Sequence, residues 1–225
     1  MKKYELTAEF IEKWGKKLFR IKALIGFGSV EAGELGGYVE KEDNLAQNGN
    51  AWVFDDAEVY GNARVYGNAR VCGNAEVYGN AWVYGNAWVF DDAWVFDDAR
   101  VYDDAEVYGN ARVYGNAEVY GNARVCGNAR VCGNARVYDD ADYLLIGRIG
   151  SRFSFTTFFK NKDKGITVSC GCFLGTIAEF RAKVTDTHGN NKHAKMYNLA
   201  ADMAELQILG EEHFDKLNTN KSEPF

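Results

Sequence analysis

Cysteine and histidine side chains are the groups in this sequence that could carry out covalent chemistry. Cys170 and Cys172 stand two positions apart, and Asp186, His188 and His193 follow them toward the end of the chain. A cysteine nucleophile needs a general base such as histidine, and a carboxylate can orient that base. These residue types are compatible with nucleophilic catalysis, but types alone do not define a site.

The local sequence predicts structural roles for the same residues. Cys170 and Cys172 alternate within a strand-like stretch, so both would lie on one face of a strand as small core residues. Thr187-His188-Gly189 is typical of a helix end with glycine as its cap. We therefore expect no catalytic residue; if the chain is an enzyme, His188 and His193 are the candidates for a general base.

The elements that would position these side chains form a C-terminal α+β region. Two antiparallel strands are expected over Arg152–Phe159 and Gly165–Phe173, followed by two helices. Thr176-x-x-Glu179 is a capping box that predicts the start of the first helix. The second helix is expected from an apolar stripe formed by Tyr197, Ala200, Ala204 and Ile208.

A six-residue repeat occupies the middle of the chain. From Ala51 to Asp140 the sequence contains fifteen unbroken copies of Ala-x-Val-(Tyr/Phe/Cys)-(Gly/Asp)-(Asn/Asp). A fixed hexad is the unit of a parallel β-helix. Since successive strand residues face opposite ways, Ala and Val point inward and the second and fourth residues point outward. Gly-Asn or Asp-Asp ends every copy and predicts a tight corner after a four-residue strand.

Stacked outward residues favour a prism with three sides. Wrapping the sequence at eighteen residues gives five coils spaced about 4.8 Å apart. This wrap places Trp82 between Arg64 and Arg100, and Glu118 between Arg100 and Arg136, as cation-π and opposite-charge neighbours. It also stacks five tyrosines on one side: Tyr66, Tyr84, Tyr102, Tyr120 and Tyr138.

The hexad Val-Tyr-Gly-Asn-Ala-Arg resembles the repeat of left-handed β-helix proteins over residues 45–146. The resemblance implies a left-handed, three-sided parallel β-helix of five to six coils. The acyltransferases of that family use coenzyme A and a histidine general base, and they usually carry a small or acidic residue where this repeat has Tyr, Phe or Cys. No histidine lies in any coil, so a coenzyme A-dependent acyltransferase is the alternative and not the leading hypothesis. The bare solenoid of bactofilins is a more distant resemblance.

Sequences without the hexad flank the repeat. We expect an N-terminal β cap over residues 1–44, the β-helix over 45–146 and the α+β region over 147–225. Segments in both flanks resemble uncharacterised hexapeptide-solenoid proteins of phages and their bacterial hosts, among them Cys170-Gly171-Cys172-Phe173. That resemblance implies one protein in which flanks and solenoid belong together, with a phage or prophage setting.

Charge and composition exclude several function classes. The repeats hold seven arginines against fourteen acidic residues, a balance of −7, and the rest of the chain is near neutral. Direct nucleic-acid binding needs a basic footprint and is not expected. No apolar run reaches the roughly 20 residues of a membrane helix. The N-terminus has no apolar signal segment and the five cysteines are an odd number, so we expect a cytoplasmic protein of a bacterium or phage-infected cell.

The outward aromatic side chains suggest a binding surface. Broad exposed apolar patches are uncommon on monomers, and the tyrosine column together with Trp82, Trp88 and Trp94 would form one. The leading hypothesis is a non-enzymatic scaffold that forms a dimer or trimer through this surface and contacts a host protein through its C-terminal region. A phage-encoded inhibitor or sponge of a host defence factor or signalling nucleotide is a further alternative. No metal or cofactor is expected, because the Asp-Asp corners are turn residues.

Overall fold

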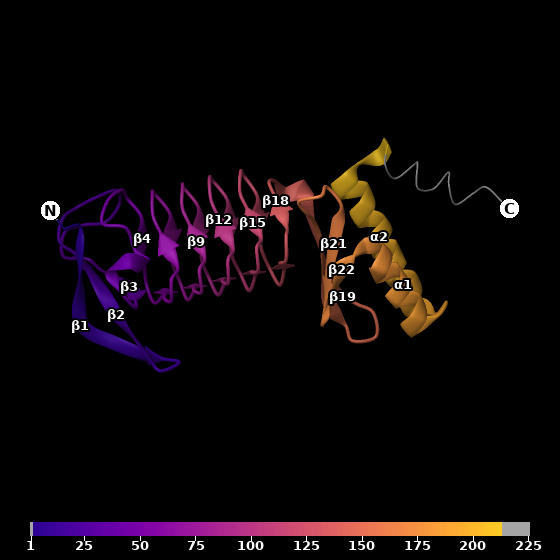
Figure 1. Cartoon of the computed structure of the whole chain (residues 1–225), viewed down its shortest axis with the longest axis horizontal. Helices are drawn as coiled ribbons and strands as arrows, with labels where there is room; N and C mark the ends of the chain where they lie inside the picture. The colour runs from indigo at the N-terminus through magenta and orange to yellow at the C-terminus, as the bar shows by residue number, and fades with distance from the viewer. Residues whose placement is uncertain (1, 213–225) are drawn as a thin grey trace.

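The computed structural model describes residues 2–212 and shows a three-sided prism of parallel β-strands between two caps (Figure 1). Each strand pairs with the strand eighteen residues further on, as in the pairing of Val83 with Val101, which confirms the three-sided wrap. The strands are shorter than the expected four residues, because only the second and third residues of each repeat have strand geometry. The first and fourth residues still bond between coils, as in the Tyr66 N–H donating to the Val83 carbonyl at 3.1 Å. These strands are β4 (Trp52–Val53), β5 (Glu58–Val59), β6 (Arg64–Val65), β7 (Arg70–Val71), β8 (Glu76–Val77), β9 (Trp82–Val83), β10 (Trp88–Val89), β11 (Trp94–Val95), β12 (Arg100–Val101), β13 (Glu106–Val107), β14 (Arg112–Val113), β15 (Glu118–Val119), β16 (Arg124–Val125), β17 (Arg130–Val131) and β18 (Arg136–Val137).

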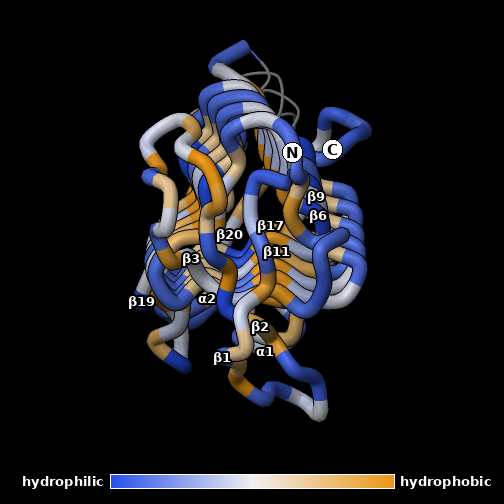
Figure 2. The backbone as a smooth tube through the Cα atoms, turned by 90° about the vertical axis from the view of Figure 1, so that its left-hand side faces the viewer, coloured by the Kyte–Doolittle hydropathy of each residue, from blue (hydrophilic) through white to orange (hydrophobic). Residues whose placement is uncertain are grey.

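The three sides of the prism are three sheets. We call face A the side built from β5, β8, β11, β14 and β17, face B the side built from β4, β7, β10, β13 and β16, and face C the side built from β6, β9, β12, β15 and β18. The view along the prism in Figure 2 shows the coils stacked behind one another. Every third repeat therefore belongs to the same face.

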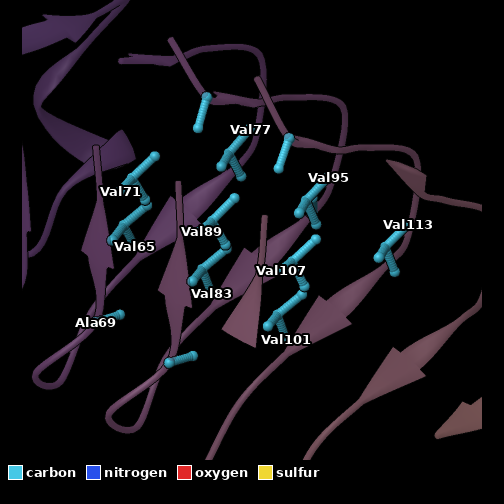
Figure 3. Close-up of a cluster of buried hydrophobic side chains, with 14 of the residues drawn as sticks. Val65, Ala69, Val71, Val77, Val83, Val89, Val95, Val101, Val107 and Val113 are labelled. Carbon is cyan, nitrogen blue, oxygen red and sulfur yellow. The ribbon is translucent and has the colours of Figure 1, made fainter. Parts of the chain in front are cut away.

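Among the residues of each repeat, only the alanine and the valine point into the interior of the prism. All fifteen alanines and all fifteen valines of the repeats are at most 1% exposed, and Figure 3 shows valines of successive coils pointing into the same core. Small side chains fill a narrow coil without voids, and packing at this density leaves no space for a longer one. The predicted inward positions are confirmed.

The corners need a left-handed backbone conformation with positive φ, which glycine adopts readily. The ten corner glycines have φ between +65° and +73°, and Asp55, Asp91, Asp97 and Asp103 take the same region at +53° to +59°. The Asp91 carboxylate accepts a hydrogen bond from the Gly109 N–H one coil further on, at 3.1 Å. The fifth Asp-Asp pair is not the expected corner: Asp139 is extended and caps a 3₁₀ turn, η2 (Asp140–Asp142), where the prism ends.

The N-terminal cap is a β-hairpin joined to face A. β1 (Tyr4–Lys13) and β2 (Lys16–Ala23) pair antiparallel, and β3 (Leu35–Val39) joins β2 to β5 of the prism. Strand-like sequence at Tyr4–Leu6 and Lys17–Leu24 predicts parts of β1 and β2, whereas β3 was not predicted. A 3₁₀ turn, η1 (Glu42–Asn44), then leads into the repeats. The cap therefore continues the first sheet of the prism.

Lys3 lies buried where this cap meets the first coil. It is 2% exposed, its Nζ donates to the Ala51 carbonyl at 2.9 Å, and the ammonium lies 4.8 Å from the centre of the Phe27 ring. Burial lowers the pKa of Lys3 from 10.5 to about 8, because leaving water disfavours the charged amine.

Replacing Lys3 with methionine tests this shift. Between about pH 8 and pH 10.5 the unfolded chain holds the Lys3 proton and the folded chain has lost it, so Lys3 contributes more stability as pH rises. The free energy of unfolding of the wild type minus that of Lys3→Met should therefore increase through this window and stay level from pH 6 to 7. Urea unfolding at each pH measures it, and a difference independent of pH would contradict the prediction.

The C-terminal cap is a four-stranded antiparallel sheet with two helices. The strands are β19 (Tyr143–Ile149), β20 (Ser154–Lys160), β21 (Ile166–Cys170) and β22 (Phe173–Thr176), followed by α1 (Ile177–His188) and α2 (Lys192–Leu209). The expectation of two strands is wrong. β19 begins directly after η2, and the Gly171-Cys172 turn divides the predicted second strand into β21 and β22, with Gly171 at φ +61°.

Two adjacent side chains of β20 join the C-terminal sheet to the prism on one side and to the two helices on the other. Phe159 packs into the alanine-valine core of the prism, while Phe158 packs into a second core with Phe180 and the helices. Figure 1 shows the sheet between the end of the prism and the two helices. The predicted capping box of Thr176 and Glu179 and the glycine cap at Gly189 are confirmed. No helix in residues 2–212 is long and apolar enough to cross a membrane.

Candidate functional site

The predicted tyrosine column forms a stacked ladder on face C. Ring centres of Tyr66, Tyr84, Tyr102 and Tyr120 follow one another at 4.9, 4.9 and 5.1 Å, with planes within 11° of parallel. Tyr138 ends the ladder with its ring turned 63° from that of Tyr120 and is 52% exposed. The spacing follows from the coils, because each ring stands on the next strand of one sheet.

The ladder presents ring edges and neutral hydroxyl groups. Burial against neighbouring rings raises the pKa of Tyr66 and of Tyr84. Burial and the adjacent Glu118 carboxylate raise the pKa of Tyr102, whose hydroxyl donates to Glu118 at 3.2 Å. The hydroxyls of Tyr66, Tyr84 and Tyr102 therefore stay protonated at neutral pH, and the surface combines apolar area with hydrogen-bonding groups.

The other two faces carry shorter aromatic stacks within residues 2–212. Face A carries a stack of four aromatic rings that was not predicted, although the eighteen-residue wrap places them in one column: Tyr60, Tyr78, Phe96 and Tyr114. The N-terminal hairpin covers its start, leaving Tyr60 only 8% exposed. Face B is interrupted by Cys72 and Cys126.

The three tryptophans of the predicted surface lie on three different faces. Trp82 belongs to face C, where its ring meets that of Tyr66 edge-on at 6.2 Å. Trp88 lies on face B beneath the Arg70 guanidinium, and Trp94 lies on face A beneath that of Arg112. The structure therefore brings Trp82 together with the ladder but not Trp88 or Trp94.

A hollow lies at the N-terminal end of the ladder. Tyr66, Trp82 and Arg64 form one side of it and residues 42–48 the other, around a volume of about 520 Å³. Residues 42–48, around η1, therefore form a wall beside Tyr66, the first tyrosine of the ladder, and we call this wall the step. Aromatic side chains at the edge of a hollow are typical of protein-binding surfaces.

The C-terminal cap contains a second cavity. It has a volume of about 320 Å³, and the residues that line it include Cys170, His188 and Tyr197. The His188 ring stacks on that of Tyr197 at 5.8 Å, and burial together with the Cys170 thiol raises the pKa of Tyr197 to about 12. The thiol of Cys170 accepts a hydrogen bond from the Thr156 hydroxyl at 3.2 Å.

The other candidates for catalysis are not brought into this cavity. Cys172 lies exposed in the β21–β22 turn, so it does not share a strand face with Cys170 as expected. Asp186 accepts a hydrogen bond from Lys183 at 3.0 Å, and no hydrogen bond joins it to His188 in the described part of the chain. His193 lies beside His188, with 5.8 Å between ring centres. The nucleophile, base and carboxylate considered from the sequence are therefore not assembled.

The prism, its hexad and its stacked faces define a β-solenoid repeat protein. Four segments of the prism, residues 57–73, 69–85, 105–121 and 129–141, match the family model described as YdcK Beta solenoid repeat. The similarity concerns the repeats, since none of the matched segments lies in the N-terminal hairpin or in the C-terminal helices. The search of curated proteins found no match to the chain.

Proposed function

We propose that this β-solenoid is a non-enzymatic scaffold that associates with further copies of itself through face C. The observation that carries the proposal is the tyrosine ladder, which runs along all five coils of face C. The hairpin packs on the aromatic residues of face A, Tyr60 and Tyr78.

Tyrosine suits such an interface for physical reasons. Its ring buries a large area with few rotatable bonds, and its hydroxyl keeps the surface compatible with water when the partner is absent. A flat, regular side also lets two copies meet along their whole length. Arg100, Glu118 and Arg136 lie on the same face, with 3.2 Å between Arg136 and Glu118. Charged groups of both signs would surround the aromatic centre, as at other protein interfaces.

Substituting two central ladder residues tests the proposal. Light scattering of the wild-type chain should show a dimer or trimer. The double variant Tyr84→Ser, Tyr102→Ser should weaken its association at least tenfold, because central aromatic residues dominate interface energies.

The matched control changes the same position of the repeat on another face. Phe90 and Tyr108 stack on face B at 4.8 Å as the tyrosines do on face C, so Phe90→Ser with Tyr108→Ser removes a comparable stack. This control should leave the subunit number unchanged. A wild-type chain that stays monomeric at high concentration, or equal weakening by both variants, would refute self-association through face C.

A further inference from the structure

Face A carries two pairs of like charges in direct register. Glu58 pairs with Glu76 near its N-terminal end, and Arg112 pairs with Arg130 near its C-terminal end. Like charges opposite one another on neighbouring strands destabilise a sheet. A group of opposite charge beside each pair would offset this repulsion.

The glutamate pair receives its counter-ion from within the chain. Lys13, at the tip of the N-terminal hairpin, forms ion pairs with both carboxylates, and its Nζ lies 2.9 Å from Glu76 Oε1. These hydrogen bonds and charges raise the pKa of Lys13 against the opposing effect of burial. The hairpin thus neutralises the acidic end of face A.

The arginine pair has no such partner in residues 2–212. Neither guanidinium forms an ion pair there, and Arg112 instead stacks over the Trp94 ring at 4.3 Å. A cavity of about 170 Å³ lies beside both side chains, and no acidic residue from the described part of the chain lines it. Phe155, Gly171 and five polar residues complete its lining: the corner residues Asn110 and Asn128 and, from the C-terminal sheet, Ser154, Thr157 and Ser169.

This small cavity adjoins the larger cavity of the C-terminal cap. Ser154 and Gly171 line both. The larger cavity of about 320 Å³ adds aromatic walls from Phe173, Phe180 and Tyr197. Its basic groups are Arg152, His188 and Lys183, the last already paired with Asp186, and among residues 2–212 no acidic residue lines it. Two basic cavities side by side stand out in a chain whose net charge is −6.

We propose that the two cavities bind a phosphate monoester with an aromatic organic part, such as a mononucleotide. The phosphoryl group lies between Arg112 and Arg130 and supplies their counter-ion, as Lys13 does for the glutamates. Guanidinium groups and hydroxyl donors together match the several acceptor oxygens of a phosphoryl dianion. The ring lies against Phe173 and Tyr197 in the larger cavity. This site is separate from the tyrosine ladder, so the proposal of a phosphate site does not depend on self-association through face C.

Calorimetric titration of the full chain at low ionic strength tests the proposal with four probes: adenosine monophosphate, adenosine, inorganic phosphate and glucose 6-phosphate. Adenosine monophosphate should bind saturably, inorganic phosphate and glucose 6-phosphate at least tenfold more weakly, and adenosine not at all. Equal binding of glucose 6-phosphate and adenosine monophosphate would refute the aromatic part. Absence of saturable binding by every phosphorylated probe would refute the site.

Arginine variants locate the site. Arg112→Gln and Arg130→Gln should each weaken binding of adenosine monophosphate about tenfold or more, the effect of losing one charge-assisted contact. Arg124→Gln, at the same repeat position on face B, is the matched control and should leave binding unchanged.

A charge reversal separates loss of binding from loss of folding. Arg130→Glu places opposite charges in register, so its melting temperature should equal or exceed that of the wild type while adenosine monophosphate no longer binds. Binding that survives Arg130→Glu, or equal weakening by Arg124→Gln and Arg112→Gln, would overturn the assignment.

Discussion

Replacing Val101 with aspartate should destabilise the prism by more than about 4 kcal/mol and prevent the chain from folding at 37 °C. Val101 lies in β12, the central strand of face C, and has no exposed surface. A carboxylate at this point would be surrounded by alanine and valine, without a hydrogen-bond donor or a path to water. In a repeat protein each coil rests on its neighbours, so this change would also separate the coils on either side.

Milder substitutions on the same strand serve as controls. Val101→Thr keeps the shape and adds one buried hydroxyl, so it should cost about 1 to 3 kcal/mol. Arg100→Gln changes the outward neighbour, 49% exposed at its side chain, and should alter the free energy of unfolding by less than about 1 kcal/mol. Urea unfolding followed by circular dichroism measures all three. A stable Val101→Asp prism would contradict the close-packed interior described above.

Replacing Gly37 with alanine should cost about 3 kcal/mol, mainly because the new methyl group has no space. Gly37 lies in β3, where the hairpin sheet meets the first coil. An added Cβ would approach the Ala57 carbonyl oxygen to 2.4 Å and Val53 Cγ1 to 2.8 Å. Both belong to the rigid first coil, so relief requires β3 to move away and lose its pairing with β5.

Gly26→Ala is the matched control for Gly37→Ala. Gly26 also lies in the N-terminal cap outside the left-handed region, and a Cβ there would lie 3.6 Å from the nearest atom, an ordinary contact. We expect a change below about 1 kcal/mol in urea unfolding. Equal effects of the two substitutions would mean that the close approach of β3 to the coil is not what requires Gly37.

The prism could be predicted from the sequence because each hexad contains both the inward and outward residues of one side and the corner that ends it. Alternation separates inward Ala and Val from outward residues, and the corner residues fix where each side ends. β3 was missed because Leu35-Gly36-Gly37-Tyr38-Val39 shows no alternation. Its role depends on close approach to the first coil, which only the folded chain shows. β19 was missed for a related reason, since Tyr143–Ile149 is apolar at its start without a period of two.

Of the candidate sites, the tyrosine ladder could be predicted from the sequence and the two cavities could not. The tyrosine ladder was predicted, since stacking depends only on the number of residues in a coil. The two basic cavities were not, because Arg112 and Ser154 meet only when the C-terminal sheet closes the prism. The Lys13 contact with Glu58 and Glu76 likewise depends on how the hairpin folds back over face A. Neither relationship has a signal in local sequence.

The even spacing of the ladder also bears on how a partner would find its position. Four parallel rings about 5 Å apart form a short one-dimensional lattice, so a partner displaced by one coil would meet nearly the same surface. Such a surface favours contact in several registers and cannot by itself select one. The turned ring of Tyr138 and the step formed by residues 42–48 interrupt this translational symmetry at its two ends. Register would therefore be decided at the ends of the face, while the middle supplies attraction.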